Sequence, residues 1–143
     1  MEERFMREAE EATKQSLCIR NDAQMGAVAV RDGKILSRGW NGAVGKTPCI
    51  TRGECIRQKN GIPSGTMREI GYCICAEQRI ICTAARDGIS LLGADMYVTK
   101  LPCAYCVRMM IAAGIRRVFY RGDYENKLGR EIAAEVGFEM IQV

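Results

Sequence analysis

Three cysteines and one glutamate have the types and the spacing of a catalytic metal site. Cys75-Ala76-Glu77 and Pro102-Cys103-Ala104-Tyr105-Cys106 each stand where the sequence pattern predicts that a helix begins. The N-terminus of a helix stabilises thiolates through its dipole and its free N–H groups. Three cysteine ligands leave the fourth position of a tetrahedral zinc ion open to water, which is typical of a catalytic rather than a structural site. We therefore expect zinc at Cys75, Cys103 and Cys106, with Glu77 beside the water as the group that moves protons.

The composition of the chain restricts how this chemistry can be done. The 143 residues include eight cysteines and no histidine, so a zinc site must use thiolates or carboxylates. No basic stretch followed by an apolar one opens the sequence, so we expect a cytoplasmic protein in which disulfides are rare. Apolar runs are far shorter than the roughly 20 residues of a membrane span. A net charge of +4 suits an anionic small ligand and is too weak to predict nucleic-acid binding.

The periodicity of the sequence predicts the elements that would position these residues. Asp32-Gly33 is a hairpin turn between two of the predicted strands. Helical segments separate the later strands, which favours a mixed sheet covered by helices in one domain over residues 1–143. Residues 41–72 show no apolar period, so another kind of interaction must order them. Helices are predicted over residues 2–17, 76–87, 104–113 and 126–136, and strands over 26–31, 34–40, 96–99, 116–120 and 138–143.

Taken together, these motifs resemble those of the deoxycytidylate (dCMP) deaminase family, within the cytidine deaminase-like superfamily. The resemblance covers nearly the whole chain and implies a three-layer α/β/α fold with a five-stranded mixed sheet. It also implies hydrolysis of dCMP to dUMP and ammonia in a homo-oligomer, a dimer or a hexamer. It is carried by the motifs Met25-Gly26-Ala27-Val28, Gly39-Trp40-Asn41-Gly42, Cys75-Ala76-Glu77-Gln78, Gly93-Ala94-Asp95-Met96-Tyr97-Val98-Thr99, Pro102-Cys103-Ala104-Tyr105-Cys106 and Ala113-Gly114-Ile115-Arg116-Arg117-Val118-Phe119-Tyr120.

The resemblance also implies roles for individual residues in the reaction. Glu77 would relay protons between water, N3 of the cytosine ring and the leaving ammonia. By position, the backbone N–H of Ala76 would hold the pyrimidine O2, Asn41 would contact the sugar, and Tyr124 would lie near the substrate. Asn41-Gly42 is also a common turn sequence, so a purely structural role for Asn41 stays open.

The first zinc ligand departs from the family pattern, because dCMP deaminases usually have histidine where this chain has Cys75. Three thiolates on zinc give a net charge of −1, against zero for one neutral histidine and two thiolates, and this should weaken the Lewis acid. Arg79, where dCMP deaminases usually have asparagine, could offset the charge by donating hydrogen bonds to the sulfur of Cys103 or Cys106. A solvated helix arginine is the alternative.

Four further cysteines suggest a second, structural zinc in the segment 42–74, which we interpret as an insertion. Some phage members of the family carry such a zinc. Its ligand positions correspond here to Cys18, Cys49 and Cys73, and Cys55 could be the fourth. A site with four cysteine ligands would order a segment that lacks a core of its own. Cys18 could instead be a buried residue at the end of a helix.

The sequence leaves two alternative functions open. The substrate could be cytidine or deoxycytidine, a modified pyrimidine, guanine or a pterin, because Cys75 and Arg79 depart together from the nucleotide-specific pattern. A non-catalytic zinc-binding module is less favoured, because a structural site has no need of Glu77. A nucleotide enzyme needs cations for the phosphate, and the candidates are Arg38, Lys46, Arg86 and Arg121.

Overall fold

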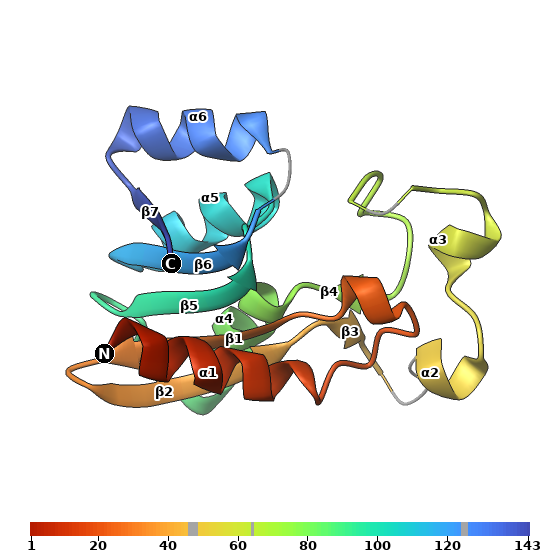
Figure 1. Cartoon of the computed structure of the whole chain (residues 1–143), viewed down its shortest axis with the longest axis horizontal. Coiled ribbons are helices and arrows are strands. Elements are labelled where there is room, and N and C mark those ends of the chain that lie inside the picture. Colours follow the sequence, from red (N-terminus) through yellow and green to blue (C-terminus); the bar gives the residue numbers. More distant parts are fainter. Residues whose placement is uncertain (46–48, 64, 124–125) are drawn as a thin grey trace.

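The protein is built around a five-stranded sheet in the order β2-β1-β5-β6-β7 (Figure 1). This computed structural model describes residues 1–45, 49–63, 65–123 and 126–143, without the side chains of residues 21, 50 and 51. Strand β1 runs antiparallel to both of its neighbours, while β5, β6 and β7 run parallel, so the predicted mixed five-stranded sheet is confirmed. The strands are β1 (Gly26–Arg31), β2 (Lys34–Trp40), β5 (Asp95–Lys100), β6 (Arg117–Gly122) and β7 (Glu139–Gln142).

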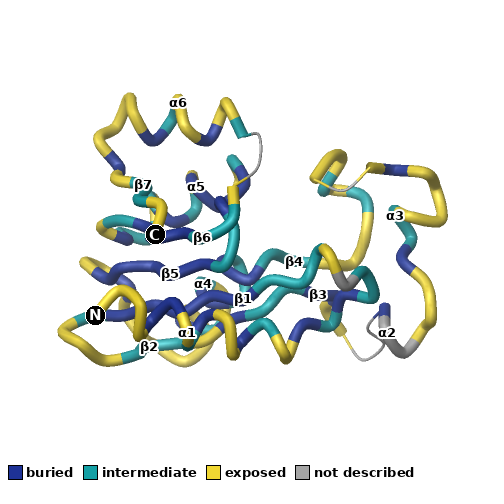
Figure 2. The backbone as a smooth tube through the Cα atoms, in the orientation of Figure 1, coloured by how far each residue is buried: buried dark blue, intermediate teal, exposed yellow. Residues whose placement is uncertain are grey.

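Helices cover both faces of this sheet, and the side chains of β1 show the two layers. Val28 and Val30 point into a core with Phe5 and Met6 of α1 (Glu2–Thr13). Ala27 and Ala29, one position out of phase, face the opposite core, because successive side chains of a strand point to opposite faces. That core is formed with α4 (Ala76–Asp87), α5 (Ala104–Ala112) and α6 (Lys127–Val136). Figure 2 shows the central strands as the most continuously buried part of the chain.

The first helix is shorter than its apolar period predicts. It ends at Thr13 rather than at residue 17. Leu17 N donates to Asn41 O at 3.0 Å, and Ser16 Oγ donates to the Asn41 side chain at 2.6 Å. These contacts with the chain after β2 replace the last turn of the helix, and they are long-range interactions that the local pattern does not contain.

The segment between β2 and α4, which has no apolar period in the sequence, contains short regular elements. Strands β3 (Gly42–Ala43) and β4 (Cys73–Ile74) pair antiparallel and close its two ends. Between them lie α2 (Cys49–Arg52) and α3 (Ile56–Lys59), to the side of the main sheet (Figure 1). A 3₁₀ turn (Asn21–Ala23) precedes β1. Among the described residues, no helix has both the length and the apolar character to cross a membrane.

Candidate metal centre and active site

The sulfur atoms of Cys75, Cys103 and Cys106 form a compact triad. All three lie within 4.8 Å of one another, and the Cys103 and Cys106 sulfurs are 3.4 Å apart. Ligands 2.3 Å from a tetrahedral zinc lie about 3.8 Å from each other. The donor set and its spacing therefore fit a zinc ion held by three thiolates.

Two helix N-termini bring the triad together. Cys75 is the N-cap residue of α4 and Cys103 is the N-cap residue of α5, both with extended backbone. Cys106 follows Cys103 by one helical turn, so the two sulfurs share a face of α5. Gln78 accepts a hydrogen bond from Cys75 N at 2.8 Å and fixes the start of α4. Hydrogen bonds from Cys106 and Cys75 hold the pKa of the Cys103 thiol far below its usual range.

Glu77 lies against this triad, inside the protein. Its side chain is buried, and Oε2 is 3.5 Å from the Cys106 sulfur. Burial raises the pKa of the Glu77 carboxyl to about 7. A carboxyl with such a pKa can both accept and release a proton near neutral pH, as an acid–base catalyst must.

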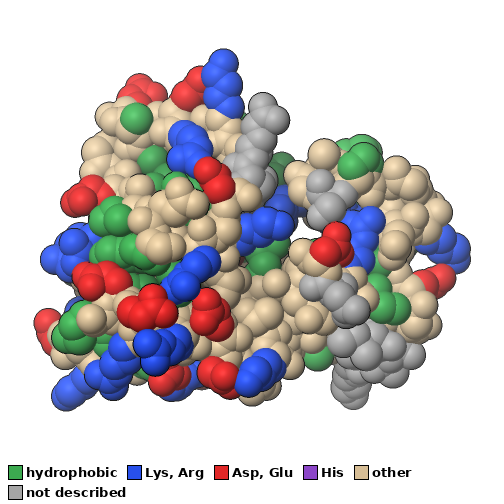
Figure 3. All heavy atoms as spheres, viewed as in Figure 1, with side chains coloured by type: hydrophobic (Ala, Val, Ile, Leu, Met, Phe, Trp, Pro, Cys, Tyr) green, Lys and Arg blue, Asp and Glu red, His purple; other side chains and the backbone are tan. Residues whose placement is uncertain are grey.

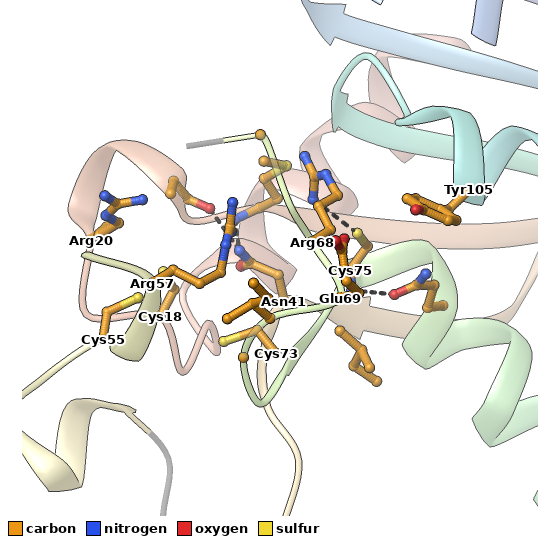
Figure 4. A pocket seen from close by; sticks show the side chains of 17 residues that line it. Cys18, Arg20, Asn41, Cys55, Arg57, Arg68, Glu69, Cys73, Cys75 and Tyr105 are labelled. Carbon is orange, nitrogen blue, oxygen red and sulfur yellow. Dashed lines mark hydrogen bonds between the residues drawn. The ribbon is translucent and has the colours of Figure 1, made fainter. Parts of the chain in front are cut away.

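A pocket of about 360 Å³ opens next to the triad and extends toward the segment 42–74. Figure 4 shows Cys75 and Tyr105 at one end and Cys18, Cys55 and Cys73 at the other. In the space-filling view the molecule is hollowed between the sheet and this segment, with Lys and Arg side chains at the rim (Figure 3). The charged side chains that line the pocket are Arg20, Arg57, Arg68 and Glu69. Three positive charges against one negative charge favour an anionic ligand.

Of the residues expected to contact the substrate, two lie within the part of the chain that the structure describes. Ala76 is buried at the first position of α4, where a backbone N–H has no acceptor within its own helix. Asn41 lines the pocket, but its amide oxygen accepts from Ser16 Oγ and from Met25 N, and its nitrogen donates to Ala23 O. Asn41 thus braces the pocket wall. Tyr124 lies outside the described residues.

The expectation that Arg79 contacts the Cys103 or Cys106 sulfur was wrong. Arg79 Nε donates to Trp40 O at 2.7 Å, and Nη2 lies 3.4 Å from Gly42 O. The side chain turns from α4 toward the end of β2 because two backbone carbonyls there accept its hydrogen bonds. A different arginine reaches the triad: Arg68 Nη1 is 3.4 Å from the Cys75 sulfur.

The other four cysteines predicted as ligands gather at the far end of the pocket. The Cys49 and Cys73 sulfurs are 3.9 Å apart. Burial and then the neighbouring thiols of Cys49, Cys18 and Cys55 raise the pKa of Cys73 to about 12. Among the described residues, however, the Cys75, Cys103 and Cys106 group alone has all its sulfurs within 4.8 Å. The sulfurs of the four other cysteines therefore lie near one another but farther apart than those of the triad.

Sequence reasoning missed the cations of the pocket. Arg38 pairs with Glu8, Arg86 with Asp87 and Arg121 with Glu3, all away from the pocket lining. The fourth candidate, Lys46, lies outside the described residues. The arginines that do line the pocket come from the turn before β1 and from the segment 42–74, where no periodic pattern indicates which side chains point inward.

Comparisons with known proteins agree with this geometry. A family model described as the cytidine and deoxycytidylate deaminase zinc-binding region matches residues 1–121. The chain is 35% identical over 127 residues to a deoxycytidylate deaminase of Mycobacterium phage D29, covering 83% of this chain and 92% of that protein. It is 31% identical over 141 residues to ComE operon protein 2 of Bacillus subtilis, covering 97% and 69%.

The solved structures include a relative with ligands bound. The dCMP deaminase from the cyanophage S-TIM5, in complex with dCMP and dUMP, superposes with a TM-score of 0.80 at 28% identity and covers 99% of this chain and 95% of its own. The family model and the identities to the curated relatives span most of the sequence, including the motifs that form the triad. The chain belongs to the cytidine and deoxycytidylate deaminase family of zinc-dependent hydrolytic deaminases.

Proposed function

We propose that this chain hydrolyses dCMP to dUMP and ammonia, with zinc held by Cys75, Cys103 and Cys106. The observation that carries the proposal is a three-sulfur triad with a buried carboxyl beside it, open to a pocket with an excess of positive charge. The relative from Mycobacterium phage D29 is named a deoxycytidylate deaminase, and the cyanophage structure contains dCMP and dUMP. Both support a nucleotide substrate.

The residues of the chain divide the reaction between them. Zinc, when bound, supplies a Lewis acid that lowers the pKa of water to about 7. Glu77 accepts a proton from the attacking water and passes it to N3 of the cytosine ring. It then takes the proton of the new hydroxyl group at C4 and delivers it to the amino group, which leaves as ammonia. Its contact with Cys106, one of the proposed zinc ligands, supports this role. The N–H of Ala76 holds the pyrimidine O2. The direction of this N–H is fixed because α4 starts at Cys75.

The pocket arginines give the nucleotide preference a physical basis. A phosphate is recognised by charge-assisted hydrogen bonds, and the planar guanidinium group suits it best. Arg20 and Arg57 line the pocket away from the triad, on the Cys18 and Cys55 side (Figure 4). We propose that they receive the 5′-phosphate, that Asn41 supports the sugar from the pocket wall, and that Tyr124 lies near the substrate.

A second zinc in the segment 42–74 is part of the proposal. The 3.9 Å between the Cys49 and Cys73 sulfurs is close to the spacing of about 3.8 Å expected for two thiolates on one zinc. Cys18 and Cys55 are buried beside them and complete a set of four cysteines. Metal analysis is expected to find two zinc ions per chain, and one in Cys49→Ser. A single zinc in the unsubstituted protein would remove the second site.

The remaining features of the molecule are proposed on the family resemblance. We expect residues 1–143 to form one domain, with residues 42–74 as a cysteine-containing insertion. We also expect a cytoplasmic homo-oligomer, a dimer or a hexamer, with neither nucleic acid nor membrane as a partner. Light scattering of the purified protein measures its mass in solution, and a monomer at micromolar concentration would contradict the assembly.

The decisive experiment combines a substrate screen with one substitution. Ammonia release is measured over dCMP, CMP, deoxycytidine, cytosine and guanine, and dCMP is expected to give the highest kcat/KM. Glu77→Gln keeps the size of the side chain and is expected to lose about 10²- to 10⁴-fold in kcat while retaining zinc. Glu135→Gln, on the exposed side of α6, is the matched control. Full activity of Glu77→Gln would refute the mechanism, and faster turnover of deoxycytidine than of dCMP would refute the substrate.

A further inference from the structure

The triad has a charge that its own residues do not balance. Three thiolates around a divalent cation carry a net charge of −1, and Cys103 and Cys106 are buried. A net charge away from water is costly unless a group of opposite sign lies beside it. The adjacent Glu77 adds negative charge whenever it is ionised. A cation in contact with one of the sulfurs would therefore stabilise the metal-loaded state.

Arg68 is the cation that the fold brings to this position. Its Nη1 lies 3.4 Å from the Cys75 sulfur, and its side chain is half-buried. Figure 4 shows the guanidinium directed at Cys75 from the segment that precedes β4.

Two other arginines near the pocket direct hydrogen bonds to backbone carbonyls and not to the triad sulfurs. Arg79 donates to the carbonyls of Trp40 and Gly42. Arg57 donates to Pro63 O at 3.1 Å and to Thr66 O. Among the described residues, Arg68 is the arginine with a hydrogen bond to a triad sulfur.

The turn that carries Arg68 is held in place by local hydrogen bonds. Just before Arg68 in the chain, Arg57 donates to Pro63 O and to Thr66 O, and Thr66 Oγ1 donates to Pro63 O at 2.8 Å. Ile70 N donates to Met67 O across Arg68, and Met67 has a left-handed backbone with a φ of 44°. A side chain on a braced turn loses less entropy on forming its contact than one on an open loop.

We propose that Arg68 is a positioning residue whose positive charge, at the Cys75 sulfur, offsets the negative charge of the third thiolate. A site with one neutral histidine and two thiolates would have no such charge to offset. This inference rests on the proposed zinc site and not on the identity of the substrate. All three sulfurs must be thiolates to hold zinc, and the loaded site then carries a net charge of −1. Arg68 therefore stabilises the loaded state more than the empty one.

The first measurement is the zinc affinity of the triad, determined by chelator competition without substrate. The triad ion is identified as the one that Cys106→Ser loses. Arg68→Met keeps the length of the side chain and removes the charge, and we expect about 10- to 100-fold weaker zinc binding. Arg68→Lys keeps the charge and should recover most of the affinity. Arg52→Met is the matched control, because Arg52 belongs to the same segment and its guanidinium lies 3.9 Å from the Tyr72 ring.

A double-mutant cycle separates charge balance from general damage. Cys75→His makes the site formally neutral, so Arg68→Met in that background should change zinc affinity by less than about threefold if charge is what couples the pair. A loss as large as in the unsubstituted protein would overturn the proposal, because it would show a structural role unrelated to the third thiolate. A second readout is the sulfur-to-cobalt charge-transfer band of the Co²⁺-loaded protein, which should shift in Arg68→Met and not in Arg52→Met.

Kinetics with two substrates distinguish charge balance from phosphate binding. If Arg68 acts through Cys75, Arg68→Met lowers kcat for dCMP and for deoxycytidine by the same factor. If Arg68 instead binds the phosphate, KM rises for dCMP alone and zinc affinity stays within twofold of the unsubstituted protein, and the proposal is refuted. Because zinc affinity is measured without substrate, a failure of the dCMP assignment leaves this test intact.

Discussion

Replacing Gly39 with alanine should damage the active site from the far side of α4. Gly39 lies in β2, and a Cβ built there would be 2.4 Å from Ala76 O and 2.7 Å from an Ile80 side-chain carbon. Ordinary contact begins at 3.4 Å, so the first turn of α4 must move by about 1 Å. That turn carries Cys75 and Glu77. A displacement of about 1 Å in catalytic groups can cost about 100-fold in rate, while overpacking costs about 1–3 kcal/mol of stability.

The two effects are measured separately. Thermal unfolding gives the stability, metal analysis gives the zinc content, and ammonia release from dCMP gives kcat. Gly122→Ala is the matched control, because it also adds a methyl group to a sheet glycine, and its Cβ would lie 3.3 Å from Thr99 O. Gly39→Ala is expected to remain folded but to lose about 100-fold in kcat, and Gly122→Ala is expected to lose little. If Gly39→Ala keeps kcat within twofold, the packing of β2 under α4 does not position the site.

Three further substitutions test the packing and electrostatics around the site. Burial alone would raise the pKa of Asp95, but hydrogen bonds from Arg116 and Arg117 hold this pKa below its usual range. The ionised Asp95 therefore stabilises the fold above about pH 4, and this stabilisation is lost as the pH falls through the folded-state pKa. Urea unfolding should show Asp95→Asn less stable than the unsubstituted protein by about 1–2 kcal/mol at pH 7, and a difference that persisted at pH 2 would contradict this account. Arg79→Ala removes the bond to Trp40 O and should cost about 1–2 kcal/mol without loss of zinc, so zinc loss would show that Arg79 serves the triad after all. Met110→Ala creates a cavity beneath α5 and should cost about 2–5 kcal/mol by calorimetry, whereas a loss under 1 kcal/mol would mean that the core closes around the gap.

Local patterns were sufficient for the elements with a strong period. The predicted helix over residues 76–87 coincides with α4, and Gly88 ends it with a left-handed φ of 69°. The five strand segments of the sheet also follow from the sequence, because apolar alternation and helix-stop residues are encoded within a few positions. The end of α1 was predicted four residues too late, since bonds from Ser16 and Leu17 to Asn41 compete with the helix.

The sequence by itself determined the candidate ligand set of the metal site. Cys75, Cys103 and Cys106 sit at helix starts, Glu77 follows two residues after the first cysteine, and the absence of histidine leaves thiolates as the main ligands. These features depend on residue type and short spacing, which are properties of the chain before it folds.

Only the tertiary structure decided which arginine meets the sulfurs. Arg79 lies one turn along α4 from Cys75, but its guanidinium donates hydrogen bonds to backbone carbonyls at the end of β2 instead. Arg68 reaches Cys75 because the chain reverses through a turn with Met67 at positive φ, braced by the contacts of Arg57. In a segment without a hydrophobic period, the direction of a side chain is set by such contacts and not by its place in the sequence.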